Sequence, residues 1–341
     1  MAHPLLPTFP PADIIRPLID LAMREDLGPG GLAGDITSRL TVAETAIGVG
    51  TFLQKEVGVV CGLPLVELVC KAYDERLRVE QIPGFHFELI EGRFSDQRLT
   101  PLVRVRGPMR SLLAAERVVL NFLQHLSGVA TQTQRFVRRV EGTRAKILDT
   151  RKTLPGYRAL EKYAVRAGGG HNHRMGLHDG VLIKDNHLAG MPTRDIAPWL
   201  EKLVKQARTE PGGGGAGGGG GAGVVGNGGG GGGGGRAASR LFEVEVDTLE
   251  QFAEVLKVDG VQVIMLDNMD CPRMEQAVRL RDAAGRRDNL ELEASGGVTL
   301  DTVRTIALTG VDRVSVGAIT HSAAALDIGL DVEDQEDRSW P

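Results

Sequence analysis

Six short apolar runs, separated mostly by segments with helical character, follow Glu141 and constrain the fold of this chain most strongly. Each run has the length and the apolar content of a β-strand rather than of a helix. The runs are AKILD (145–149), GVLIKD (180–185), LFEVEV (241–246), VQVIML (261–266), LELEA (290–294) and RVSVG (313–317). Because strands that alternate with helices form a parallel sheet covered on both faces, six such units predict an α/β barrel.

The residues before these runs have a different pattern. Apolar side chains recur at helical spacing over 12–27, which predicts an amphipathic helix. The Gly-rich residues 25–38 are expected to form a turn region. Short β-like runs then flank a predicted helix at Leu65–Tyr73, and a longer helix is predicted over 111–131. This mixture is typical of a small α+β domain.

The pattern predicts three parts. We expect residues 1–130 to form the N-terminal α+β domain with its connecting helix, 131–325 to form the barrel, and 326–341 to form a tail that returns to the first domain. Within the barrel region, residues 212–235 have only five side chains other than glycine. So little apolar surface cannot offset the entropy lost on ordering, and we interpret this tract as a flexible insertion. A mobile lid or a partner-binding segment is the alternative.

Composition argues against several classes of protein. A net charge of −4 over 341 residues gives no reason to expect nucleic acid or an anionic membrane as a partner. No apolar run approaches the roughly 20 residues that a membrane span needs, and the N-terminal residues lack the pattern of a secretory signal. The three cysteines, Cys61, Cys70 and Cys271, form no CxxC pair and indicate reduced thiols. We therefore expect a cytoplasmic globular protein.

Five side chains between 149 and 187 form the first candidate site. Each lies at a predicted strand end or in the Gly-rich loop between two strands; they are Arg151, Lys152, His173, Arg174 and Lys184. The C-terminal ends of barrel strands meet at the active site, so these groups should converge. Arg pairs with carboxylate or phosphate through two hydrogen bonds, and Lys offers a point charge. The set predicts a pocket for a small polyanion; scattered surface salt bridges are the alternative.

Two carboxylates end the next strands. Glu245 lies near the end of LFEVEV and Asp267 follows VQVIML. Such a pair can hold Mg²⁺ together with waters and substrate phosphates, or accept hydrogen bonds from ribose hydroxyls. Glu243 shares a strand face with Glu245, because side chains alternate along a strand, so spacing alone does not choose between them. A structural acid paired with a buried cation is the alternative reading of either glutamate.

The last two strands end in glycine-containing segments, EASGGV (293–298) and SVGAITHS (315–322). Gly at a strand end lets backbone N–H groups approach an anion closely. The corresponding loops of α/β barrels often bind phosphate. Ser295, Gly296 and Gly317 are the candidate phosphate ligands, with His321 as a supporting donor. A glycine marks an ordinary turn more often than a phosphate site. Here, however, the position after the final two strands favours phosphate binding.

Several blocks together closely resemble the quinolinate phosphoribosyltransferase family. They are GPMRSLLAAERVVLNFLQHLSGVAT (107–131), DTRKT (149–153), GGGHNHR (168–174), LIKDNH (182–187), FEVEVD (242–247), IMLDN (264–268), LEASGGV (292–298) and VSVGAITHSAAALDIGLD (314–331). The resemblance covers most of the chain in order. It implies an incomplete parallel α/β barrel of about six strands with an N-terminal α+β sandwich-like domain. Residues 25–38 are longer than the family's corresponding block, and 212–235 depart from it.

The resemblance also implies an activity and residue roles. The family transfers the phosphoribosyl group of 5-phosphoribosyl 1-pyrophosphate (PRPP) to quinolinate with decarboxylation, giving nicotinate mononucleotide, pyrophosphate and CO₂ for NAD biosynthesis. By resemblance, Lys152 lies between the two substrates, Glu245 rather than Glu243 acts with Asp267 on Mg²⁺ and ribose, and Arg117 reaches into the neighbouring subunit's site in a homodimer. The quinolinate carboxylates would be surrounded by Arg151, His173, Arg174 and Lys184.

Two other functions are alternatives for this chain. A paralogue of the same fold, of the kind associated with molybdenum transport, would act on another substrate, and the complete set of five side chains between 151 and 184 argues against it. A non-catalytic scaffold would be expected to have lost Lys152, Glu245 or Asp267, and all three are present.

Overall fold

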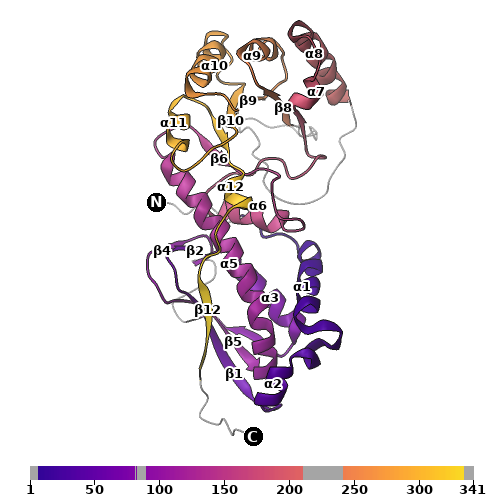
Figure 1. Ribbon diagram of the computed structural model, residues 1–341, viewed down its shortest axis with the longest axis vertical. Coiled ribbons are helices and arrows are strands. Elements are labelled where there is room, and N and C mark those ends of the chain that lie inside the picture. Colours follow the sequence, from indigo (N-terminus) through magenta and orange to yellow (C-terminus); the bar gives the residue numbers. More distant parts are fainter. Residues whose placement is uncertain (1–6, 81, 83–89, 210–240, 334–341) are drawn as a thin grey trace, which may run out of the picture. The chain divides into compact units, whose positions relative to one another are not determined.

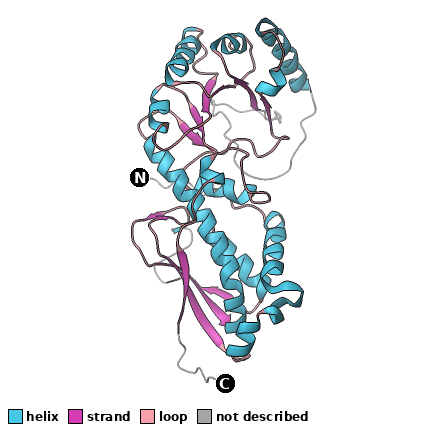
Figure 2. Cartoon of the chain, viewed as in Figure 1, coloured by secondary structure: helices cyan, strands magenta, loops and turns pink. Residues whose placement is uncertain are grey.

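The computed structural model of the chain describes residues 7–80, 82, 90–209 and 241–333 (Figures 1 and 2). The chain divides into two compact units, which are described separately below. The predicted insertion at 212–235 and the end of the predicted tail at 334–341 lie outside the described residues. The first unit comprises Met1–Gln134, Thr153–Gly169 and Ile319–Pro341, and the second comprises Arg135–Lys152 and Gly170–Ala318.

An antiparallel sheet organises the first unit (Figure 2). A second, two-stranded sheet pairs β2 (Gly58–Val59) with β4 (Phe94–Ser95). Helix α5 (Met109–Arg139) begins directly after β5 and continues into the second unit. The four strands of the main sheet lie in the order β12 (Ile328–Glu333), β1 (Ile47–Gln54), β5 (Thr100–Pro108) and β3 (Arg78–Glu80). The other helices are α1 (Ala12–Leu27), the 3₁₀ segment η1 (Gly28–Gly34), α2 (Ile36–Thr41), α3 (Leu63–Tyr73) and α6 (Arg158–Ala167).

The helices predicted at 12–27, 65–73 and 111–131 are confirmed, although α5 is longer than expected. The Gly-rich residues 25–38 differ from the expected turn, because they are mostly helical. The Asp35 side chain accepts the Ser38 N–H at 3.0 Å, and α2 begins there. Among the described residues, no helix combines the length and the apolar content needed to cross a membrane.

The run VGVVCGL (57–63) forms a strand only at Gly58–Val59. Side chains satisfy the backbone of the following residues instead of a neighbouring strand. Ser127 Oγ accepts the Cys61 N–H at 3.0 Å, and the buried Glu91 carboxylate accepts the N–H groups of Gly62 and Leu63 at 2.7 and 3.0 Å. The carboxylate thereby starts α3, since the first N–H groups of a helix need outside acceptors.

A six-stranded parallel sheet organises the second unit and confirms the prediction from the six apolar runs. The first of these strands in the sequence, β6, pairs with the last, β11, and β7 forms the opposite edge of the sheet. Because β6 and β7 are the two edge strands and do not pair with each other, the barrel is open. Helices α8 to α11 lie along one face of this sheet (Figure 1). The strands lie in the order β6 (Lys146–Leu148), β11 (Arg313–Ser315), β10 (Glu291–Ser295), β9 (Val263–Asp267), β8 (Leu241–Val246) and β7 (Gly180–Ile183). The intervening helices are α7 (Asp185–Leu188), α8 (Thr193–Thr209), α9 (Leu249–Val255), α10 (Cys271–Ala283) and α11 (Val303–Leu308).

One face of this sheet carries buried charged and polar side chains, which differs from the near-continuous apolar strands expected. Phe242 and Val244 lie on the apolar face of β8, and Glu243 and Glu245 lie on the other. The strand register places Glu243 beside Val263 and Glu245 beside Met265 on β9, and these two residues pair in turn with Glu291 and Glu293 on β10. This face is therefore mixed: the apolar Val263 and Met265 separate the acids of β8 from the polar positions Asp267, Glu291, Glu293, Ser295, Arg313 and Ser315.

The three cysteines differ in burial, and this difference predicts their reactivity. All are unpaired; Cys61 and Cys70 are buried, and Cys271 at the start of α10 is partly exposed. Burial raises the pKa of Cys70 to about 12, and the thiolate is the reactive form. We expect one thiol to react rapidly with a disulfide reagent in the native protein, and three after unfolding. Cys271→Ser should abolish the rapid phase; a remaining rapid phase would contradict the assigned burial.

Candidate active site

Asp149 holds the loop that carries His173 against the end of β6. Its Oδ1 accepts the backbone N–H of His173 at 2.8 Å, and its Oδ2 accepts Asn172 Nδ2 at 2.6 Å. His171 N donates to Ile147 O at 2.8 Å, so the loop continues alongside β6. Asp149 is fully buried. Asp149 was not among the predicted site residues; the sequence signal that could have found it is an acid at the end of an apolar strand, directly before the basic residues.

Two guanidinium groups, those of Arg151 and Arg174, are close enough to repel each other. Burial and the charge of Arg151 lower the pKa of Arg174 below its usual value. Arg174 Nη1 donates to the Gly180 carbonyl at 3.0 Å, whereas its Nε is buried and has no hydrogen-bond partner among the described residues. A buried donor beside a second cation favours an anion, because an anion would satisfy the donor and relieve the repulsion.

His173 lies beneath these cations, against the face of the sheet that carries Glu243 and Glu293. The Arg174 backbone N–H donates to its Nδ1 at 2.7 Å, and its Nε2 lies 2.9 Å from Glu243 Oε2 and 3.6 Å from Glu293 Oε1. Both ring nitrogens thus face groups of the protein. Because the backbone N–H of Arg174 is hydrogen-bonded to this ring, His173 holds the Arg174 backbone in place.

The two glutamates under His173 belong to a buried charged layer. Arg313 Nε lies 2.7 Å from Glu293 Oε2, and the Ser315 hydroxyl also donates to Glu293. His173, Glu243 and Glu293 are near enough to one another to hold a metal ion. However, the Arg313 guanidinium already neutralises Glu293, and a second cation there would be repelled. We assign these groups to an internal ion-pair layer.

A carboxylate cluster lies at the ends of β7, β8 and β9 and is defined by Asp185, Glu245, Asp247 and Asp267. Lys184 Nζ donates to Glu245 Oε2 from the neighbouring strand. Burial, and then repulsion by Asp267 and Asp185, raise the pKa of Glu245 against the effect of Lys184. Burial, Asp185 and Asp267 also raise the pKa of Asp247. Hard divalent cations bind to such groups of carboxylate oxygens.

The glycine loop, residues 295–297, begins at the last residue of β10. Gly296 and Gly297 have φ of 92° and 61°, a left-handed conformation that favours glycine. Gly317 follows the neighbouring strand β11 and precedes α12 (Ala318–His321). Asn268, which was not predicted as a site residue, lies beside this loop after β9 and also has a positive φ of 51°.

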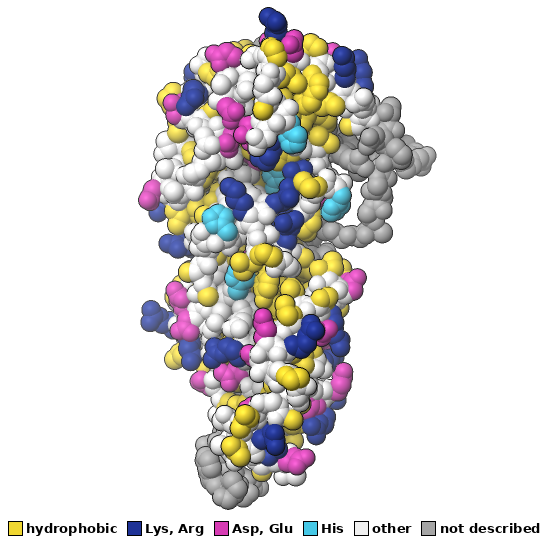
Figure 3. Space-filling model, turned by 45° about the vertical axis from the view of Figure 1, so that its right-hand side comes forward, with side chains coloured by type: hydrophobic (Ala, Val, Ile, Leu, Met, Phe, Trp, Pro, Cys, Tyr) yellow, Lys and Arg dark blue, Asp and Glu magenta, His cyan; other side chains and the backbone are white. Residues whose placement is uncertain are grey.

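The predicted residues divide between the two units. The second unit contains Arg151, Lys152, His173, Arg174, Lys184, Glu245, Asp267, Ser295, Gly296 and Gly317 at the carboxyl ends of its strands or in the loops that follow. Arg117 and His321 belong to the first unit and are exposed there. His321 Nδ1 lies 2.6 Å from Ser322 Oγ. On the face shown in Figure 3, Lys and Arg side chains gather beside His side chains.

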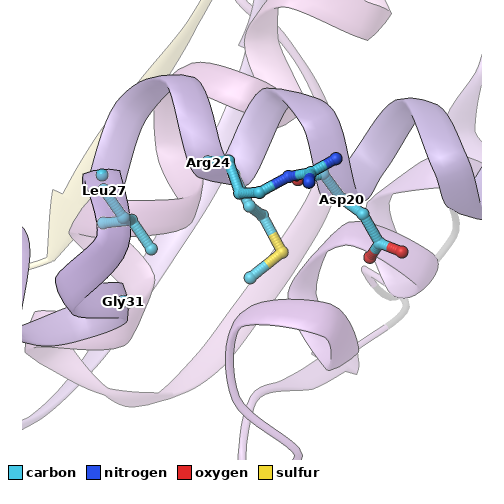
Figure 4. A pocket seen from close by; sticks show the side chains of 6 residues that line it. Asp20, Arg24, Leu27 and Gly31 are labelled. Atoms are coloured by element: carbon cyan, nitrogen blue, oxygen red, sulfur yellow. The ribbon is translucent and has the colours of Figure 1, made fainter.

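A separate hollow of about 420 Å³ lies in the first unit, between α1 and η1 (Figure 4). Asp20, Arg24, Leu27 and Gly31 line it, and Arg24 Nε donates to the Asp20 carbonyl at 3.2 Å. The hollow contains none of the predicted site residues, and its one strong cation is already bonded. We assign it no ligand.

Comparison with known proteins identifies the family. Residues 35–127 match the quinolinate phosphoribosyl transferase N-terminal domain, and residues 129–214 and 236–331 match the C-terminal domain of the same family. The C-terminal match leaves out most of the glycine tract.

Relatives of known name cover nearly the whole chain. The nicotinate-nucleotide pyrophosphorylase (carboxylating) of Mycobacterium leprae (strain TN) is 39% identical over 94% of this chain and 98% of its own. A probable enzyme of the same name from Bacillus subtilis (strain 168) is 34% identical over 93% of each chain. The solved nicotinate-nucleotide pyrophosphorylase of Francisella tularensis superposes with a TM-score of 0.76 at 30% identity, covering 98% of this chain and 100% of that one. This chain belongs to the quinolinate phosphoribosyltransferase family.

Proposed function

We propose that the protein is a quinolinate phosphoribosyltransferase (decarboxylating), which makes nicotinate mononucleotide, pyrophosphate and CO₂ from quinolinate and PRPP in the de novo synthesis of NAD. The observation that carries this proposal is the pair Arg151 and Arg174, two mutually repelling guanidinium groups, in the same unit as a carboxylate cluster at the strand ends; the buried Nε of Arg174 has no hydrogen-bond partner among the described residues. This arrangement suits a dianion on one side and a metal-bound phosphate ester on the other. Relatives named nicotinate-nucleotide pyrophosphorylase (carboxylating), one of them as probable, support it at 39% and 34% identity.

The basic groups would bind and orient quinolinate. Arg174 and Arg151 would pair with its two carboxylates, and His173 would hold the Arg174 backbone in place. Lys184 would exchange part of its pairing with Glu245 for a substrate carboxylate. Lys152 would lie between quinolinate and PRPP. With the ring fixed in this way, its weakly nucleophilic nitrogen would point at C1′ of the ribose. This orientation would lower the activation barrier for forming the bond between the two atoms.

The carboxylate cluster fits a divalent cation, since Asp185 and Asp267 raise the pKa of Glu245 and of Asp247, and Lys184 pairs with Glu245 alone among the four. We propose that Glu245 and Asp267 hold Mg²⁺, partly through water and substrate oxygens, and accept hydrogen bonds from the ribose hydroxyls. The bound ion would neutralise charge that develops on the departing pyrophosphate. Ser295, Gly296 and Gly317 would donate to the 5-phosphate, with His321 in support.

The bond changes balance without a covalent enzyme intermediate. The ring nitrogen forms a bond to C1′, and pyrophosphate leaves with the electrons of the C1′–O bond. The nitrogen then carries a positive charge. When the neighbouring carboxylate leaves as CO₂, the electrons of the broken C–C bond stay on C2, where the charged nitrogen stabilises them, and C2 takes a proton from solvent.

Turnover tests this proposal. With quinolinate, PRPP and Mg²⁺, the protein should form nicotinate mononucleotide, and EDTA in excess should stop the reaction. Formation of product at the same rate with EDTA would contradict the metal assignment, and no product from well-folded protein would contradict the activity.

We further propose a homodimer in which Arg117 completes the neighbouring subunit's site, as its exposed position in α5 allows. Arg117→Ala and Lys152→Ala should each be inactive alone. After mixed refolding, half of the dimers should contain one intact site out of two, which gives about a quarter of the wild-type activity. Mixing Lys152→Ala with a Lys184→Ala variant is the control and should restore nothing. Failure of the first mixture to regain activity would contradict shared sites.

The two alternative functions, a molybdenum-associated paralogue and a non-catalytic scaffold, have less support. The relatives at 39% and 34% identity are named as pyrophosphorylases rather than as molybdenum-associated proteins, and a scaffold would not need a buried Arg174 donor that lacks a partner in the described part of the chain. A cytoplasmic location stays a prediction, and the relative from Oryza sativa subsp. japonica is named as chloroplastic.

A further inference from the structure

Asn268 has an unusual backbone conformation at the junction between the carboxylate cluster and the glycine loop. It follows the last residue of β9 with a φ of 51°, and it shares a positive φ with only one other non-glycine residue, Leu99, in the described part of the chain. Asn tolerates the left-handed region better than most residues, yet the conformation still costs free energy. Such strain persists where the surrounding structure holds it in place.

Three contacts hold Asn268 and join two strands. Its backbone N–H donates to the Ser295 carbonyl at 3.0 Å, which connects the ends of β9 and β10. Its Nδ2 donates to Asp267 Oδ2 at 2.6 Å. Its Oδ1 lies against Gly296, where an added Cβ would be 2.1 Å away. One side chain thus touches both the carboxylate and the loop.

The contact with Asn268 gives a reason for glycine at position 296 that a phosphate-binding role alone does not. A glycine at 296 is needed twice, once for its φ of 92° and once because the Asn268 amide occupies the space of a side chain. Gly297 also has a positive φ, but an added Cβ there would meet nothing within 4 Å. The close approach is therefore specific to the pair 268 and 296.

We propose that Asn268 is a positioning residue that sets the spacing between the Asp267 carboxylate and the glycine loop, and so fixes the register of the phosphoribosyl donor between its metal and its 5-phosphate. This inference rests on the proposed function of Asp267 and Gly296. It adds no new contact with quinolinate, so the two substrates should respond differently to its loss.

The first test is Asn268→Gly, which keeps the left-handed backbone and removes the amide. We expect the KM for PRPP and the Mg²⁺ concentration for half-maximal activity each to rise about tenfold, with the KM for quinolinate changed less than twofold. Calorimetric binding of PRPP with Mg²⁺ should weaken by a similar factor. An equal rise in both KM values, or no change in either measurement, would overturn the proposal.

The second test is a double-mutant cycle. Gly296→Ala should lower kcat/KM about 100-fold in the wild-type background and only about tenfold in Asn268→Gly, because the clashing oxygen is gone while the backbone strain is common to both. Asn268→Asp keeps an oxygen over residue 296, so Gly296→Ala should be as damaging there as in the wild type. This variant also keeps the test valid if Asn268→Gly fails to fold.

Gly297→Ala is the matched control for backbone strain. Its effect should be the same with Asn or Gly at position 268, since no side-chain contact joins the two positions. Additive effects at both 296 and 297 would contradict the proposed coupling. Inactive wild-type protein that still binds PRPP with Mg²⁺, and binds it more weakly after Asn268→Gly, would refute the proposed reaction and leave the role of Asn268 intact.

Discussion

Arg174→Ala is expected to raise the KM for quinolinate about 100-fold while changing the KM for PRPP less than threefold. The guanidinium is half-buried, its pKa is lowered by burial and by Arg151, and its Nε has no hydrogen-bond partner among the described residues. An anionic substrate is the group that would satisfy it. Its loss therefore removes binding energy for quinolinate, and steady-state kinetics with each substrate varied in turn would measure the loss.

Two variants sharpen this measurement. Arg174→Lys keeps the charge and loses the planar fork, and it should fall between the wild type and the alanine variant. Arg279→Ala removes an exposed arginine that pairs with Glu275 on α10, and both KM values should stay unchanged. Equal losses for quinolinate and PRPP in Arg174→Ala would show that the residue supports the fold of the site and does not bind the dicarboxylate.

Asp312→Ala is expected to lower the free energy of unfolding by about 3 to 5 kcal/mol. Asp312 lies just before β11 and bonds to Arg281 Nη1, whose side chain is fully buried, and to the Leu292 N–H at 2.8 Å. Removing the carboxylate leaves the Nη1 end of a fully buried guanidinium without its charged partner, although Nε still pairs with Asp282 at 2.8 Å. Guanidinium chloride unfolding followed by the fluorescence of Trp199, on α8 of the same unit, would measure the change.

The control for this prediction is Arg144→Ala. Arg144 also pairs with Asp312, at 2.7 Å, but its side chain is 41% exposed. Exposed pairs contribute about 0–1 kcal/mol, so this variant should stay close to the wild type. Because Asp312 lies at the amino end of β11, opposite the strand ends that carry the site, the folded Asp312→Ala protein should retain its KM values. A large KM change would contradict this separation of stability from chemistry.

The sequence patterns were sufficient for the strands and for the set of charges at their ends. Short apolar runs that alternate with helices predict a parallel sheet. Because all strands of such a sheet run in the same direction, Arg151, Glu245 and Asp267 lie at the same, carboxyl-terminal end of the strands. These features depend on local composition and period, which a sequence displays directly.

Other features depend on contacts between distant residues and could not be read in the same way. Glu243 and Glu245 are equivalent by period, and only the structure shows that His173 meets the first and Lys184 the second. The end of β2 depends on Glu91 and Ser127, which lie 28 to 29 and 66 residues from the N–H groups they accept. The strained turn at Asn268 depends on Gly296, and neither residue predicts the other.

A side-by-side assay of quinolinate and nicotinate tests the central claim most directly. Each substrate would be supplied with PRPP and Mg²⁺, the quinolinate labelled in its 2-carboxylate, and both nicotinate mononucleotide and labelled CO₂ would be measured. Two carboxylates held by Arg151 and Arg174 predict equal amounts of nucleotide and CO₂ from quinolinate, and no measurable nucleotide from nicotinate. Comparable turnover of nicotinate, or nucleotide formation without CO₂ release, would contradict the dicarboxylate site.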